Sequence, residues 1–197
     1  MGEFAAPIVL GIRYFQSGQH CSDVQPGDLV LVRHTHSIFG RGIRLVERLR
    51  KPSSVSRAEW RGYAAWNHAM IGVGDNLVSQ EASRGDEFTD LLTYVADDYA
   101  VVSIAMTSEQ RDGVVAFSKS ILGDGYGYFT IPADLFNALT GVELVLGLGN
   151  MMVCSTASAR ALERSSFIPD RSPYAVTPAH LAWYFGVPYN DQVAVVQ

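Results

Sequence analysis

The stretch that decides the fold is residues 66–83, WNHAMIGVGDNLVSQEAS. Two runs rich in apolar and β-branched residues flank the turn residues Gly74-Asp75-Asn76, which is the pattern of a β-hairpin. The first run begins near His68, so the sequence predicts a strand that carries an imidazole at its start. Because side chains alternate along a strand, we expect His68, Met70 and Gly72 on one face.

The length of the turn decides which residue of the second strand shares the face of His68. With a two-residue turn, Asp75-Asn76, Met70 lies opposite Glu81, which is then diagonal to His68 and within its reach. A three-residue turn shifts the register by one and puts Gln80 on that face instead. The sequence leaves both registers open, together with a third interpretation in which Glu81 is a solvated residue at a strand end.

Further strands and helices are expected on both sides of this hairpin. LVLV, after the turn Pro26-Gly27-Asp28, and YAVVSIA, at 99–105, are typical of strands. Apolar spacing and capping residues predict helices at 40–51, 107–122, 132–141, 154–164 and 177–186. A strand, a helix, a group of strands and then mostly helices indicate an α+β fold, with a small antiparallel sheet packed against helices.

Length and composition are typical of one globular domain. The chain has 197 residues, of which 48% are hydrophobic, and a net charge of −5. This is enough for a sizeable core and gives no reason to expect a nucleic-acid partner. Residues 1–20 show no clear pattern, so we expect an N-terminal arm of uncertain structure before a single domain at 21–197.

The sequence also bears on location. The apolar run near the N-terminus is short and follows Glu3 rather than a basic segment, unlike a secretory signal. No stretch reaches the roughly 18 to 20 apolar residues of a spanning helix. We therefore expect a cytoplasmic protein without a membrane span, with release by lysis or another signal-independent route as an open alternative.

Cys154 is the candidate nucleophile. It stands where an apolar run gives way to the predicted helix CSTASARAL, and a helix N-terminus favours a thiolate and offers N–H groups to an oxyanion. A nucleophilic cysteine needs a base, and His68 on its strand is the preferred one of the five histidines, with Glu81 as the residue that orients it. The local sequence alone fits equally a buried thiol that only packs, and we expect both Cys21 and Cys154 to be free.

No cofactor or metal is expected. His34-Thr35-His36 brings two imidazoles together, but no further ligands follow at metal-binding spacing. The glycine-rich stretch GDGYG at 123–127 lacks the Lys-Ser/Thr ending of a phosphate-binding loop.

A basic segment occupies residues 41–61. It holds seven of the 15 lysines and arginines, opposed only by Glu47 and Glu59. One interpretation is a solvated helix face, and the other is a patch for an anionic substrate or surface.

The order of the segments resembles one known family. In chain order they are PGDLVLVR, NHAMIGV, SQEAS, LGDGYGY, VCSTASARAL and VTPAHLA. With histidine early and cysteine late, this order is similar to that of the circularly permuted papain-like amidases, the YiiX-like branch of the NlpC-type thiol hydrolases. The similarity extends from about Pro26 to about Phe185.

The resemblance implies a permuted papain-like fold and a cysteine peptidase or amidase. By position, Cys154 resembles the nucleophile, His68 the base and Glu81 the third polar residue, whereas Gly127 stands where the family often has an aspartate. The implied reaction is cleavage of an amide bond, in a peptide or cell-wall peptide, through a thioester and without a cofactor. A lipid esterase or acyltransferase is one alternative, and a non-catalytic binding or structural protein is the other.

Overall fold

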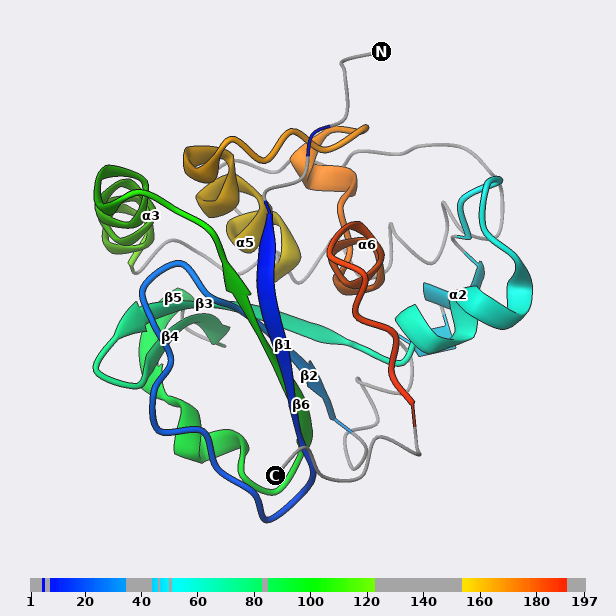
Figure 1. Cartoon of the computed structure of the whole chain (residues 1–197), viewed down its shortest axis with the longest axis horizontal. Helices are drawn as coiled ribbons and strands as arrows, with labels where there is room; N and C mark the ends of the chain where they lie inside the picture. Colours follow the sequence, from blue (N-terminus) through cyan, green and yellow to red (C-terminus); the bar gives the residue numbers. More distant parts are fainter. Residues whose placement is uncertain are drawn as a thin grey trace.

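The computed structural model describes residues 5, 8–34, 44, 45, 47–49, 51–82, 85–122 and 154–190. They form a six-stranded antiparallel sheet and several helices, which confirms the α+β class (Figure 1). The predicted helix at 132–141 and the glycine-rich stretch at 123–127 lie outside the described residues. The strands are β1 (Val9–Phe15), β2 (Leu29–Arg33), β3 (His68–Gly74), β4 (Leu77–Ala82), β5 (Gly85–Asp90) and β6 (Asp98–Ile104).

The strand order in the sheet is β1-β6-β2-β3-β4-β5. β2, the predicted LVLV strand, lies near the middle, where residues 29–32 are all fully buried because both faces of the strand are covered. The N-terminal segment, for which the sequence predicted no definite structure, contributes β1, which pairs with β6 at one edge. Residues 9–15 are therefore part of the sheet.

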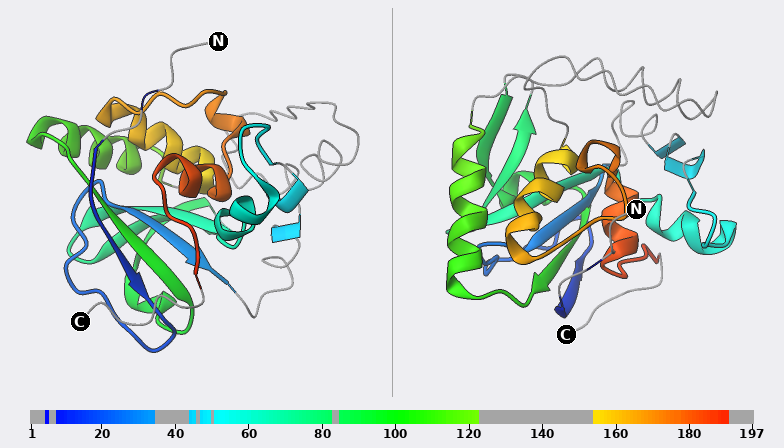
Figure 2. Two further views of the ribbon diagram at one scale, coloured as in Figure 1. Left: turned by 45° about the vertical axis from the view of Figure 1, so that its right-hand side comes forward. Right: turned by 90° about the horizontal axis from the view of Figure 1, so that it is seen from above.

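The helices lie mainly on one side of the sheet. Seen from above, α5 (Cys154–Leu162) and α6 (Pro178–Tyr184) cross the strands, with α3 (Ser108–Ser120) and α2 (Arg57–Tyr63) at opposite sides (Figure 2). Short 3-10 helices add η1 (Leu91–Tyr94), η2 (Glu163–Ser165) and η3 (Pro173–Ala175). Among the predicted helices, three match α3, α5 with η2, and α6, and the described residues at 44–49 are also helical.

Two predicted caps are present. Thr107 and Gln110 form the expected capping box at the start of α3, where each side chain binds the backbone N–H of the other residue. Thr177 caps α6, with Pro178 in the first turn. These capping residues therefore predicted the starts of α3 and α6 correctly.

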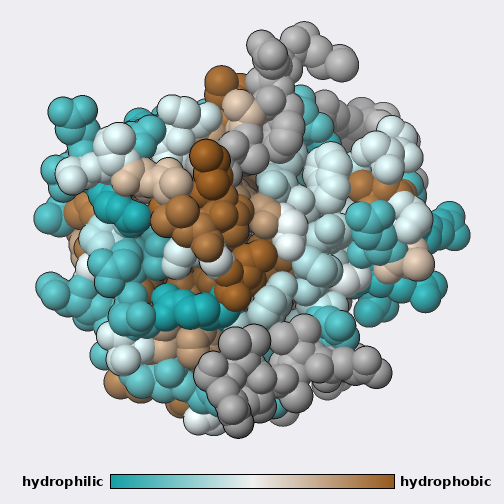
Figure 3. Space-filling view, in the orientation of Figure 1, coloured by the Kyte–Doolittle hydropathy of each residue, from teal (hydrophilic) through white to brown (hydrophobic). Residues whose placement is uncertain are grey.

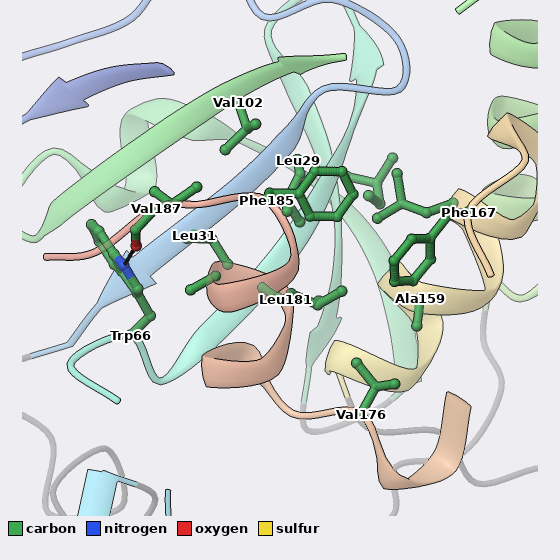
Figure 4. Close-up of a cluster of buried hydrophobic side chains, with 14 of the residues drawn as sticks. Leu29, Leu31, Trp66, Val102, Ala159, Phe167, Val176, Leu181, Phe185 and Val187 are labelled. Atoms are coloured by element: carbon green, nitrogen blue, oxygen red, sulfur yellow. Dashed lines mark hydrogen bonds between the residues drawn. The ribbon is translucent and has the colours of Figure 1, made fainter. Parts of the chain in front are cut away.

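The larger core lies between the helices and the sheet. Leu29 and Leu31 of β2 point into it and meet Leu181 of α6 and Phe185 (Figure 4). The Trp66 indole donates to the Val187 carbonyl at 2.7 Å, which ties the segment after α6 to the start of the hairpin. A second core on the other side of the sheet is formed by Val30, Val32 and Met70 with neighbours from η1 and β6.

The turn at Pro26-Gly27-Asp28 packs directly against the hairpin. Gly27 N donates to the Gly72 carbonyl and Gly72 N to the Asp28 carbonyl, both at 2.8 Å. A Cβ at position 72 would lie 2.5 Å from the backbone oxygen of Gln25, so only glycine fits there. The approach of the turn to Gly72 fixes β2 beside β3 and thereby the position of His68.

A buried polar chain anchors the helical residues 44–49. Arg171 donates to His180 Nε2 at 2.7 Å, and His180 Nδ1 accepts from Thr177 N at 3.3 Å and lies 2.8 Å from Thr177 Oγ1. Thr177 in turn donates to the Glu47 carboxylate at 2.6 Å. The Trp60 indole donates to the Glu47 carbonyl at 2.7 Å. Glu47 is thus turned inward and fastens this basic helix to α2 and α6.

Candidate functional site

His68 opens β3, as the sequence predicts, and is half-buried. Its Nε2 lies 3.4 Å from the Tyr94 hydroxyl, and its ring centroid is 5.6 Å from that of His34. Burial, and secondly the neighbouring His34, lower the pKa of His68 from 6.5 to about 3. The imidazole is therefore neutral at physiological pH, and a neutral imidazole is the form that accepts a proton.

Cys154 opens α5, also as predicted, and its side chain is half-buried. Apart from Arg160 and Leu162, the rest of the helix is built of small residues, all of them buried, so the helix lies close against the sheet and packs on β3. Ser155 donates to the Val176 carbonyl at 2.8 Å and fixes the first turn. The first N–H groups of an α-helix have no partner within the helix, and N–H groups of this kind can stabilise an oxyanion.

Tyr94 is the neighbour that the imidazole and the thiol share. Besides its contact with His68, its pKa is raised first by burial and then by Cys154, Asp97 and Glu87. Its phenol therefore keeps its proton, and Cys154 lies close enough to act on it electrostatically. Tyr94 therefore contacts His68 directly, and Cys154 is among the groups that raise its pKa.

Side-chain alternation defines which side of the sheet each group uses. Ala69 and Ile71 belong to the core beneath α5, whereas Met70 belongs to the second core, so His68 takes the side of Met70. The 3-10 helix η1 covers that side through Leu91 and Tyr94. His68 is thus held between the sheet and η1, at the end of β3.

His34 forms a second imidazole beside the first. Its Nδ1 lies 2.8 Å from the Asp97 carboxylate. Its backbone is held by Asn67, whose amide oxygen accepts from His34 N at 2.9 Å and whose amide nitrogen donates to His34 O at 3.0 Å. His36 lies outside the described residues. No group of three or more His, Cys, Asp or Glu suited to a metal ion occurs in the described part of the chain.

For Gln80 and Glu81 the structure describes only the backbone. The turn has two residues, Asp75 and Asn76, with φ of 51° and 61°, as in a type I′ hairpin. The register then shifts, so that Gly72 pairs with Val78 and Ile71 with Ser79. Continued along the strands, this sets Gln80 opposite Met70, which is the second of the two registers that the sequence leaves open, and not Glu81. The side chains of Gln80 and Glu81 lie outside what the structure describes.

Tyr94, His34 and Asp97 are the site residues that sequence reasoning missed or set aside. Tyr94 is the last residue of the 3-10 helix LLTY, which has neither strand alternation nor helical periodicity. The only available signal was Asp90, whose side chain caps this helix by accepting from Leu92 N at 2.9 Å.

No protein-family model matches the chain, and no curated protein matches it either. Among the described residues, no helix has the length and apolar character needed to cross a membrane.

Proposed function

We propose that this chain is a thiol hydrolase in which Cys154 is the nucleophile and His68 the base. The observation that carries the proposal is the packing of α5, which Cys154 opens, against β3, which His68 opens. Tyr94 contacts the imidazole, and the thiol is among the groups that raise the pKa of Tyr94. The chain order of histidine and cysteine, by resemblance to the circularly permuted papain-like amidases, supports the same pair and a peptide amide as substrate. The permuted papain-like fold is part of this proposal.

In the proposed reaction, His68 takes the proton of the Cys154 thiol and the sulfur attacks the carbonyl carbon of the amide. The N–H groups at the start of α5 stabilise the negative oxygen. The C–N bond then breaks, His68 returns its proton to the leaving amine, and a thioester remains. Water, deprotonated by His68, attacks the thioester, which releases the carboxylic acid and restores the thiol.

Tyr94 orients the base in this reaction. If His68 accepts the thiol proton on Nδ1, its Nε2 carries a hydrogen that the Tyr94 oxygen accepts. A neutral phenol stabilises the resulting imidazolium less than a carboxylate does, which agrees with the low pKa of His68. Tyr94 is therefore the positioning residue in the role that the sequence assigned to Glu81.

Thiol labelling tests the proposal. The native protein is treated with iodoacetamide near neutral pH, and the modified peptides are followed by mass spectrometry. Cys154 should react rapidly and lose that reactivity in His68→Ala, whereas Cys21 should react slowly in both. Cys21 is a matched internal control because burial raises the pKa of its thiol.

The Tyr94→Phe variant separates orientation from folding. Loss of one net hydrogen bond of about 1 kcal/mol should lower kcat/KM on a peptide amide about fivefold, with most of the loss in kcat.

The labelling experiment also has an outcome that contradicts the proposal. If Cys154 is alkylated only after unfolding, in a protein whose circular dichroism is native, the chain is a non-catalytic binding or structural protein.

A further inference from the structure

The basic segment forms a pocket that the proposed hydrolase site does not use. Its volume is about 550 Å³. The residues that line it come from the helix at 44–49, the segment that follows and α2, and they are Arg48, Leu49, Lys51, Arg57, Trp60 and Arg61. Four of these six side chains are cations, and none is acidic.

The arginines of the pocket are available to a ligand. Arg48, Arg57 and Arg61 are exposed, and within the described part of the chain no carboxylate pairs with any of them. Lys51 is held in place by donating to the carbonyls of Pro52 at 2.8 Å and Val55 at 2.6 Å. Guanidinium groups bind phosphate through paired N–H donors, so a phosphate ester is the ligand chemistry that fits.

One of the two acidic residues in this segment does not contribute its charge to the outer face. Glu47 is 2% exposed and accepts a hydrogen bond from Thr177, so its carboxylate faces the protein interior. Glu59 remains on the surface of α2. Figure 3 shows strongly hydrophilic residues at the right-hand edge of the molecule, over α2. The outer face of the segment is therefore more basic than its composition indicates.

Exposed leucines accompany the cations. Leu45 is 57% exposed and Leu49 52%, and they lie one helical turn apart on the same side of the helix. Leu49 also lines the pocket. A soluble phosphate ester gives no role to such leucines, whereas a bilayer does, because a basic helix with apolar side chains beside its cations lies in the interface between headgroups and acyl chains.

We propose that this pocket binds the phosphate of an anionic phospholipid, with Leu45 and Leu49 inserted into the bilayer surface. The arginines and Lys51 contact the headgroup phosphate, and the buried Glu47 chain holds the helix in place. The proposal does not depend on the reactivity of Cys154, and the Cys154→Ala variant should bind vesicles as the parent chain does.

Vesicle sedimentation tests this proposal. The chain should bind vesicles of phosphatidylcholine mixed with phosphatidylglycerol and not those of phosphatidylcholine alone, and salt should weaken the binding. The double variant Arg57→Gln/Arg61→Gln should partition about 30-fold more weakly, at about a fivefold loss for each arginine. The control Lys119→Gln/Arg164→Gln makes the same change of net charge with exposed residues of α3 and η2. An equal loss in the control would show unspecific attraction and overturn the proposal.

A second measurement separates a bilayer from a soluble ligand. Leu45→Ser/Leu49→Ser should weaken vesicle binding while leaving the four cations in place. Titration with glycerol phosphate should give only weak binding in every variant. If glycerol phosphate binds as tightly as the vesicles do and the leucine variant is unchanged, the site is one for soluble phosphate esters. Absence of binding to anionic vesicles also refutes the proposal.

Discussion

Acidification should destabilise the folded chain through His68. The folded state holds this imidazole with a pKa of about 3, whereas the same side chain titrates at 6.5 in the ordinary, solvated state. Between these two values the unfolded chain binds more protons than the folded chain, so the free energy of unfolding falls as the pH falls. The contribution of His68 is fully present above 6.5 and is lost progressively toward about 3.

The two titration curves give the magnitude. At about pH 5 the unfolded imidazole is almost fully protonated and the folded imidazole almost fully neutral. Relative to about pH 8, His68 should lower the free energy of unfolding by about 2 kcal/mol, at about 1.4 kcal/mol per pKa unit. With a urea dependence of about 2 kcal/mol per molar, this shifts the denaturation midpoint by about 1 M.

Urea denaturation at both pH values measures this effect. The parent chain should show the full pH dependence, and His68→Gln should lose about 2 kcal/mol of the difference between the two pH values. His20→Gln is the matched control, because it makes the same substitution at an exposed imidazole outside the candidate site. If His68→Gln and the parent chain keep the same pH dependence, His68 is not a half-buried, neutral imidazole in the folded chain, and the prediction is refuted.

Two further substitutions test the packing. Gly72→Ala should cost about 2 kcal/mol or more, because its Cβ would lie 2.5 Å from a backbone oxygen, whereas Gly11→Ala, with nothing within 4 Å, should be nearly neutral in the same urea experiment. Thr177→Ala should cost about 1 to 2 kcal/mol more than Thr107→Ala in thermal or urea unfolding, because both threonines cap a helix but only Thr177 also satisfies the buried Glu47 carboxylate. Equal losses at the two threonines would contradict the buried polar chain.

The sequence predicted those parts of the fold that depend on neighbours along the chain. The hairpin turn at Asp75-Asn76 and the caps at Thr107 and Thr177 are local, so the residues that specify them stand close together in the sequence. The starts of β3 at His68 and of α5 at Cys154 were predicted for the same reason.

The missed elements depend on partners that are distant in the chain or have weak patterns. β5, GDEFTD, is polar and becomes a strand through its pairing with β4. β1 contains Gly11 and is specified by its pairing with β6. α2, RAEWRGY, is short and contains Gly62, although Ser56 caps it through the backbone N–H of Glu59 at 3.2 Å. In each case the tertiary partner outweighs the local preference.

The register of β4, which decides whether Gln80 or Glu81 shares the face of His68, could not be predicted for a different reason. The turn length was among the alternatives considered, but the shift in register between Gly72 and Gly74 was not. Such a shift leaves no mark in an alternating apolar pattern, yet it exchanges the faces of all later residues in β4. The proximity of Tyr94 to His68 could not be predicted from the sequence, because only the folded sheet brings η1 against His68.

The position of β6 has a consequence for how the chain assembles. β6 is the last of the described strands in the sequence, yet it lies between β1 and β2 in the sheet. During synthesis from the N-terminus, β1 has no partner until residues 98–104 have emerged, and β2 lacks one of its two neighbours until then. Pairings so distant in sequence form slowly, and the apolar strands remain open to other chains in the meantime. Among the described strands, β1 is thus the one that is separated from its partner by the longest stretch of chain.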